Sequence, residues 1–194
     1  MPDVELILVA ALDRSGGLGV NNSLLCHLPG DLRHFRQLTR GQGVLMGART
    51  WDSLPAAFRP LPQRHNLVLS HKPAPEGLAA TPQQALAQIS PERPHTTAWL
   101  PGWAEAIALA RALSLSQLWV IGGADIYRQA LPHATQLWLT RIDHVFEAAD
   151  AFFPPLDGLP FECTQRRPGP DDADWPYQFE HWVRHGPAPD LSAL

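Results

Sequence analysis

The sequence predicts an α/β protein with a mostly parallel central sheet and helices on both faces. Apolar runs without alternation recur along the chain, as in strands that are covered on both sides. Segments of helical periodicity separate these runs, which is typical of parallel βαβ units. The end differs, because Phe161–Arg167 and Tyr177–His185 flank the loop Pro168–Pro176 and predict a closing antiparallel hairpin.

The expected elements can be placed in chain order. Strands are expected at Leu6–Leu12, Val44–Gly47, Asn66–Ser70, Thr97–Leu100, Leu118–Ile121 and Gln136–Ile142. Helices are expected at Asp31–Thr39, Ala48–Leu54, Pro82–Ile89, Trp103–Leu113 and Ala124–Ala130. Between them, Asp13–Gly30 is a long, polar, glycine-rich connection. Loops of this length without secondary structure of their own are often lids or binding loops.

Composition limits the class of protein. With 194 residues, 45% of them hydrophobic and 18% charged, the chain predicts one domain over residues 1–185 and a flexible tail over 186–194. The net charge of -4 predicts no nucleic-acid and no membrane partner. The N-terminus is acidic and its apolar run has only seven residues, so we expect a cytoplasmic protein. Cys26 and Cys163 predict free thiols, with one bridge as the alternative. No histidine pair has ligand spacing, so no metal is predicted.

Asp31 is the first candidate for chemistry. The apolar residues Leu32, Phe35 and Leu38 recur at helical spacing. Asp31 lies four residues before Phe35, so its carboxylate shares this apolar face. A carboxylate there is costly unless a polar group meets it. On this stretch alone, the alternative is a first-turn acid that caps the helix or complements its dipole.

Two strand-to-helix turns could approach a phosphate. Residues 120–127 form a strand, the pair Gly122–Gly123 and a helix start, although a turn that needs glycine only for packing would look the same. They lack the three spaced glycines of the dinucleotide fingerprint. After Gly47, Arg49 and Thr50 could reach phosphate oxygens. Arg64 could form a fork with a carboxylate, or could be an ordinary surface arginine.

The order of the motifs resembles that of the dihydrofolate reductase family from about Val4 to Arg184. The matching pieces are Ile7–Ala11, Gly19, Leu28–Leu32 with Phe35, Val44–Gly47 with Thr50 and Trp51, Pro60–Asn66, Val120–Tyr127, Leu139–Asp143 and Tyr177–Glu180. The resemblance implies a three-layer fold and NADPH-dependent reduction of 7,8-dihydrofolate to 5,6,7,8-tetrahydrofolate. Hydride would go to C6 and a proton to N5, supplying one-carbon and thymidylate metabolism. It also implies a monomer that antifolate inhibitors bind.

The resemblance also assigns roles to residues. Asp31 would hold the pterin and aid proton delivery through water, Thr140 would steady both, and Cys26 would lie where most relatives have a tryptophan that supports this water. The expected substrate-binding residues are Val9, Ala10, Asp31, Leu32, Phe35, Leu54, Arg64, Ile121, Tyr127 and Thr140. The expected cofactor-binding residues are Ala11, Leu18, Gly19, Asn22, Ser23, Leu24, Gly47, Arg49, Thr50, Ser70, His71, Lys72, Gly122, Gly123, Ala124, Asp125 and Ile126.

Departures from the family pattern leave two alternatives. Cys26 is a weak hydrogen-bond donor, and Ala48 stands where many relatives have an arginine for cofactor phosphates. Residues near Ala57 and from about Gly77 to Thr97 form insertions. One alternative is a reductase of the same fold that acts on a ribosylaminopyrimidine of riboflavin synthesis. The other is a non-catalytic folate-binding or nucleotide-binding protein.

Overall fold

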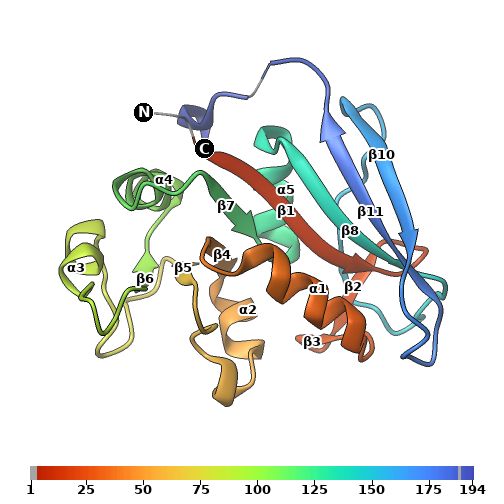
Figure 1. Ribbon diagram of the computed structural model, residues 1–194, viewed down its shortest axis with the longest axis horizontal. Coiled ribbons are helices and arrows are strands. Elements are labelled where there is room, and N and C mark those ends of the chain that lie inside the picture. The colour runs from red at the N-terminus through yellow and green to blue at the C-terminus, as the bar shows by residue number, and fades with distance from the viewer. Residues whose placement is uncertain (1–3, 188) are drawn as a thin grey trace.

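Eight strands form one sheet at the centre of the computed structural model, which describes residues 4–187 and 189–194 (Figure 1). Their order across the sheet is β10-β11-β8-β1-β7-β4-β5-β6. Strands β8 to β6 pair in parallel, whereas β11 and β10 pair antiparallel, as the sequence predicted. The bounds are β1 Glu5–Leu12, β4 Gly43–Gly47, β5 His65–Leu69, β6 Thr97–Leu100, β7 Gln117–Val120, β8 Gln136–Ile142, β10 Phe161–Pro168 and β11 Tyr177–Arg184.

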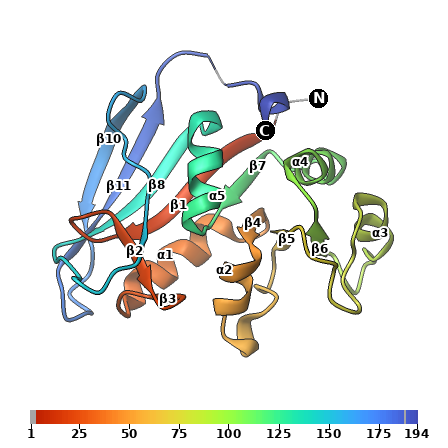
Figure 2. The same ribbon diagram turned by 180° about the vertical axis from the view of Figure 1, so that it is seen from behind.

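Helices cover both faces of the sheet, which confirms the three-layer arrangement (Figure 2). One face packs against α1 (Pro29–Thr39) and α2 (Ala48–Ser53), and the other against α3 (Pro82–Ala87), α4 (Trp103–Ala112) and α5 (Ala124–Ala130). In β1, Ile7 faces the first pair of helices, whereas Leu6 and Leu8 face the second group. All three side chains are fully buried, which is why β1 lacks polar alternation.

The predicted loop Asp13–Gly30 contains short strands, so the expectation of no regular structure there is wrong. β2 (Gly17–Val20) pairs with β3 (Ser23–Leu24) and with β9 (Ala151–Phe152), and the three form a small second sheet. The described residues also include the 3-10 turns η1 (Ala56–Phe58), η2 (Leu131–His133) and η3 (Leu191–Ala193). None of the helices described is long and apolar enough to cross a membrane.

The buried carboxylate of Asp13 anchors the second sheet. Its Oδ1 accepts hydrogen bonds from the Ser15 amide (2.8 Å), the Ser15 hydroxyl (2.7 Å) and the Gly17 amide (2.7 Å). Its Oδ2 accepts one from the Phe146 amide (2.9 Å), so both loops next to β2 are fixed to the end of β1. Burial alone would raise the pKa of Asp13, but these hydrogen bonds outweigh it and hold that pKa below its usual value.

The end of the chain is attached to the domain. Leu191 in η3 is buried in the core cluster on the α4 and α5 face. His133 Nδ1 lies 3.0 Å from the Asp190 carbonyl oxygen. Residues 1–3 of the predicted domain and residue 188 of the predicted tail lie outside the described residues. Both the domain boundary and the flexibility of the tail stay predictions.

We expect Asp13→Ala to lower the free energy of unfolding by about 3 kcal/mol, because buried amides lose a charged acceptor. Urea denaturation at pH 7 measures the change. Asp157→Ala, at an exposed position, should stay within roughly 0.5 kcal/mol. Because the folded pKa of Asp13 is lowered, its stabilisation is present above the pKa of an unfolded aspartate and is lost as the pH falls through the folded pKa. Equal stability of Asp13→Ala and wild type would contradict this assignment.

Candidate active site

Asp31 and Thr140 meet between α1 and β8. The Thr140 hydroxyl donates a hydrogen bond of 2.6 Å to Asp31 Oδ1. Thr140 is buried on the sheet face that α1 covers, and Asp31 lies in the first turn of that helix. The helix begins after Leu28, which makes no side-chain cap. Asp31 is therefore not the cap of α1, and its carboxylate is directed to the sheet.

The surroundings of Asp31 favour its neutral form. Burial raises the pKa of Asp31, and the hydrogen bond from Thr140 offsets only part of this effect. Nearby, the buried Tyr127 donates a hydrogen bond of 2.7 Å to the Val9 carbonyl oxygen. Burial, with the Asp31 charge, raises the pKa of Tyr127, so this phenol stays protonated and holds α5 against β1. A carboxyl group whose pKa is raised by burial suits acid–base chemistry.

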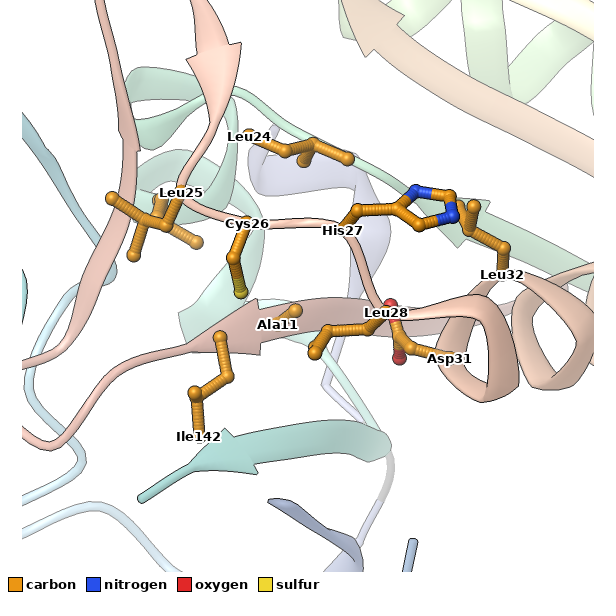
Figure 3. Close-up of a pocket in the computed structure, with 10 residues that line it drawn as sticks. Ala11, Leu24, Leu25, Cys26, His27, Leu28, Asp31, Leu32 and Ile142 are labelled. Atoms are coloured by element: carbon orange, nitrogen blue, oxygen red, sulfur yellow. The ribbon is translucent and has the colours of Figure 1, made fainter. Parts of the chain in front are cut away.

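A pocket opens beside the Asp31 carboxylate (Figure 3). It encloses about 30 Å³, enough for an ordered water molecule. Its lining brings together predicted site residues from β1, β2, β3, the loop after β3 and α1: Ala11, Leu18, Leu24, Cys26, Asp31 and Leu32. The lining also includes four residues that the sequence analysis did not assign to the site: Leu25, His27, Leu28 and Ile142. The signal for Ile142 was its place two residues after Thr140, on the same face of β8.

Cys26 lies between the second sheet and α1, and Figure 3 shows its sulfur directed toward β1 and β8. Cys26 and Cys163 are both free thiols, as predicted, so the alternative of a bridge is wrong. Burial raises the pKa of the Cys26 thiol, and the charges of Asp31 and Asp174 raise it further. Cys26 is therefore a neutral thiol that shares its pocket with the candidate acid.

Arg64 is buried, with 5% of its surface exposed, so the alternative of a surface arginine is wrong. Its Nε donates to the Pro62 carbonyl oxygen (2.9 Å) and its Nη1 to the Thr39 hydroxyl (3.1 Å). Its guanidinium carbon lies 5.5 Å from the centre of the Phe35 ring. Burial, with the charge of Arg36, lowers the pKa of Arg64. No carboxylate among the described residues pairs with this guanidinium, which leaves donors for an acidic ligand group.

The two glycine turns lie side by side at the carboxyl ends of the parallel strands. The Gly47 amide donates to the Gly122 carbonyl oxygen (2.8 Å), joining the turn after β4 to the turn after β7. A Cβ on Gly122 would lie 3.2 Å from the Tyr127 ring and 3.5 Å from Thr50 Oγ1. In open α/β sheets this edge is where ligands bind. The second sheet reaches the same turn, since Asn22 Nδ2 donates to the Arg49 carbonyl oxygen (3.0 Å).

Other predicted residues are distributed around this edge. Val9, Leu54 and Ile121 pack in the core cluster on the α1 and α2 face, whereas the Ala10 side chain packs on the opposite face. The residues that follow β5 do not line the pocket beside Asp31 but lie at the same edge of the sheet: Ser70, His71 and Lys72. The part of the chain that the structure describes holds no group of three or more side chains suited to a metal ion.

This arrangement defines an α/β protein with a ligand site at the carboxyl ends of parallel strands, where one carboxylate faces a mostly apolar pocket. Comparison with known proteins then identifies the family. The family model "Dihydrofolate reductase" matches residues 5–184, and the chain belongs to the dihydrofolate reductase family. As members of that family do, it reduces dihydrofolate to tetrahydrofolate with a nicotinamide cofactor.

Curated relatives agree with this assignment. The chain is 37% identical over 153 residues to a dihydrofolate reductase of Mycobacterium tuberculosis. The aligned region covers 77% of this chain and 80% of the relative. It is 33% identical over 185 residues to one of Neisseria meningitidis, covering 94% and 99%. With one of Bacillus subtilis it shares 30% identity over 172 residues, 89% of each chain.

We expect Cys26 to report the charge of Asp31. In a Cys163→Ser background, labelling of Cys26 by a disulfide reagent at pH 8 should accelerate about threefold in Asp31→Asn, because loss of the neighbouring charge lowers the thiol pKa. Asp171→Asn, at an exposed position, is the matched control and should not change the rate. An unchanged rate in Asp31→Asn would mean that the two groups do not interact.

Proposed function

We propose that this protein uses NADPH as hydride donor and Asp31 as the acid that serves dihydrofolate. The Asp31–Thr140 hydrogen bond carries the proposal. It leaves the other carboxylate oxygen free to accept hydrogen bonds from the 2-amino group and a ring nitrogen of the pterin. A carboxyl group whose pKa is raised by burial can pass a proton through water to N5. The pocket beside Asp31 has room for such a water.

Cys26 is proposed to take the place of the indole that most relatives have beside this water. A thiol is a weak donor, so Cys26 would orient the water less firmly than an indole N–H. The proton path would then rely on Asp31 and Thr140, whose hydrogen bond does not involve the thiol. Cys26 would therefore contribute less to catalysis than the indole does, while the substrate pocket stays the same.

Arg64 is proposed to bind the α-carboxylate of the glutamate tail. Its two hydrogen bonds to the protein hold the guanidinium in place, and Phe35 lies beneath it. Leu32 is 38% exposed and, with Phe35 and Leu54, would form the apolar wall along the pterin and benzoyl rings. A buried cation paired with an apolar wall favours a folate over a ribose phosphate, which argues against the riboflavin-pathway alternative.

The residues at the strand ends fit a nicotinamide dinucleotide. The space beside Gly122 and Gly123 is one that a Cβ would fill, and the Thr50 hydroxyl borders it. We propose that Thr50 and the turn from Gly122 hold the pyrophosphate. Position 48 is alanine where many relatives have an arginine, and we propose that the exposed Arg49 and Lys72 bind the 2′-phosphate of NADPH instead. When bound, the cofactor supplies the hydride for C6. Ala11 and Leu18 would orient the nicotinamide, and Leu24 would exclude water.

The family also suggests how the protein is assembled and inhibited. We propose that it works as a monomer in the cytoplasm and that antifolates compete with dihydrofolate at Asp31. Nothing in this proposal calls for a metal or a nucleic-acid partner.

We expect purified protein to oxidise NADPH only when dihydrofolate is present. In Asp31→Asn, kcat/KM for dihydrofolate should fall by about 10²–10⁴ because the acid is lost. Absorbance at 340 nm measures the rate, and Asp171→Asn should match wild type. Turnover that persists in Asp31→Asn would exclude the proposed proton path. Binding of NADPH and methotrexate without turnover in wild type would instead support the non-catalytic alternative.

We expect Arg64→Gln to raise KM for dihydrofolate by about 10–100-fold with little change in kcat, because the tail carboxylate loses its partner. The matched control is a substrate: dihydropteroate lacks the glutamate, so its KM should be the same in wild type and Arg64→Gln. An equal loss for both substrates would show that the substitution disturbs the pocket rather than the tail site.

A further inference from the structure

The loop between β10 and β11, residues 169–176, packs directly on the first turn of α1. A Cβ on Gly30 would lie 2.3 Å from Tyr177 Oη and 2.5 Å from Pro170 Cγ. Real Cβ atoms do not approach so closely, so any larger residue at position 30 would displace the loop or the helix. The contact joins two parts of the chain that are about 140 residues apart in the sequence.

The N-terminus of α1 makes no side-chain cap from its own segment. Leu28 is the residue at the cap position, and no side chain caps from there. The first amides of a helix have no partner inside the helix and need one from outside. Thus α1, the helix that carries Asp31, depends on another part of the chain to fix its first turn.

Asp172 in the β10–β11 loop supplies such a partner, because its carboxylate accepts a hydrogen bond from the Gly30 amide. Its Oδ1 accepts a hydrogen bond of 2.6 Å from the Tyr177 hydroxyl, and its Oδ2 accepts one of 2.8 Å from Arg33 Nη2. The Asp172 side chain is 22% exposed, so these contacts are partly shielded from water. The Tyr177 hydrogen bond, with those from Arg33 and the Gly30 amide, lowers the pKa of Asp172, so the carboxylate is charged at neutral pH.

The same loop also reaches the pocket. Tyr177 belongs to a small buried cluster with Leu28 and Ile142, both of which line the pocket beside Asp31. Cys26 and Trp175 of the loop both pack against this cluster. A displacement of the loop would therefore reach the pocket lining as well as the helix.

We propose that Asp172 is a positioning residue that fixes the first turn of α1 and so orients the Asp31 carboxylate toward the substrate. The inference rests on the proposed role of Asp31. Asp172 holds Gly30, one residue before Asp31, and Arg33, two residues after it, while Thr140 holds the carboxylate itself. Asp31 is thus held in two ways: Asp172 fixes the backbone around it, and Thr140 fixes one carboxylate oxygen. Both contacts are needed to direct the remaining carboxylate oxygen at a ligand.

The test compares Asp172→Ala and Asp172→Asn with Asp171→Ala, the exposed neighbour in the same loop. Asp172→Ala removes all of the contacts, and we expect kcat/KM for dihydrofolate and the affinity for methotrexate each to fall about tenfold. KM for NADPH should stay within about twofold, because none of the loop contacts described above involves a predicted cofactor residue. The pH profile of kcat should shift, since Asp31 titrates in a different setting. Asp171→Ala should behave as wild type.

Asp172→Asn keeps the shape and an acceptor for Tyr177 but loses the charge, so a smaller loss of about threefold is expected. If Asp172→Ala does not fold, Asp172→Asn decides, and wild-type kcat/KM and pH profile in that variant would overturn the proposal. A lower Tm in Asp172→Ala with unchanged kcat/KM, methotrexate affinity and pH profile would also overturn it, by showing a structural role alone. Failure of the proposed function is distinct, because wild type itself would then not reduce dihydrofolate.

Discussion

The carboxylate of Asp31 imposes the constraint on which the rest of the site depends. A carboxylate away from bulk water needs polar partners, and the one that the described residues supply is the Thr140 hydroxyl at 2.6 Å. That hydrogen bond ties α1 to β8, two elements of different layers. It satisfies one oxygen and leaves the other to a ligand with N–H donors, which a pterin provides. The pocket lining, the buried Arg64 and the loop on Gly30 are all arranged around the same helix.

Unbroken apolar runs and segments of helical periodicity made most of the fold predictable. The bounds of α5 and β8 agree with the sequence prediction, because each segment has a clear period between turn residues. The second sheet was not predictable, since β3 and β9 have two residues each and a period cannot be read from so few. The pairing of β2 with β9 also joins segments more than a hundred residues apart, and such a contact cannot be predicted from the local sequence.

A site residue was predictable where a charged side chain lies on an otherwise apolar face of its segment. Asp31 on an apolar helix face was such a conflict, but only the family resemblance named Thr140 as its partner. The burial of Arg64 was not predictable, because the polar stretch around it is equally compatible with a surface loop. Asp13 and Asp172 gave no signal, since the groups they bind are mostly backbone amides or distant side chains.

The anchors of the second sheet run through the main chain. Asp13 accepts from the amides of Ser15, Gly17 and Phe146, and Asp150 accepts from the amide of Asn21 at 2.8 Å. Every residue except proline offers such an amide. Mutation can therefore change the pocket-facing side chains from Leu24 to Cys26 while the backbone keeps its position. Selection by an inhibitor would act on these positions first, because substitutions there change the pocket lining and leave the main-chain anchors of the second sheet in place.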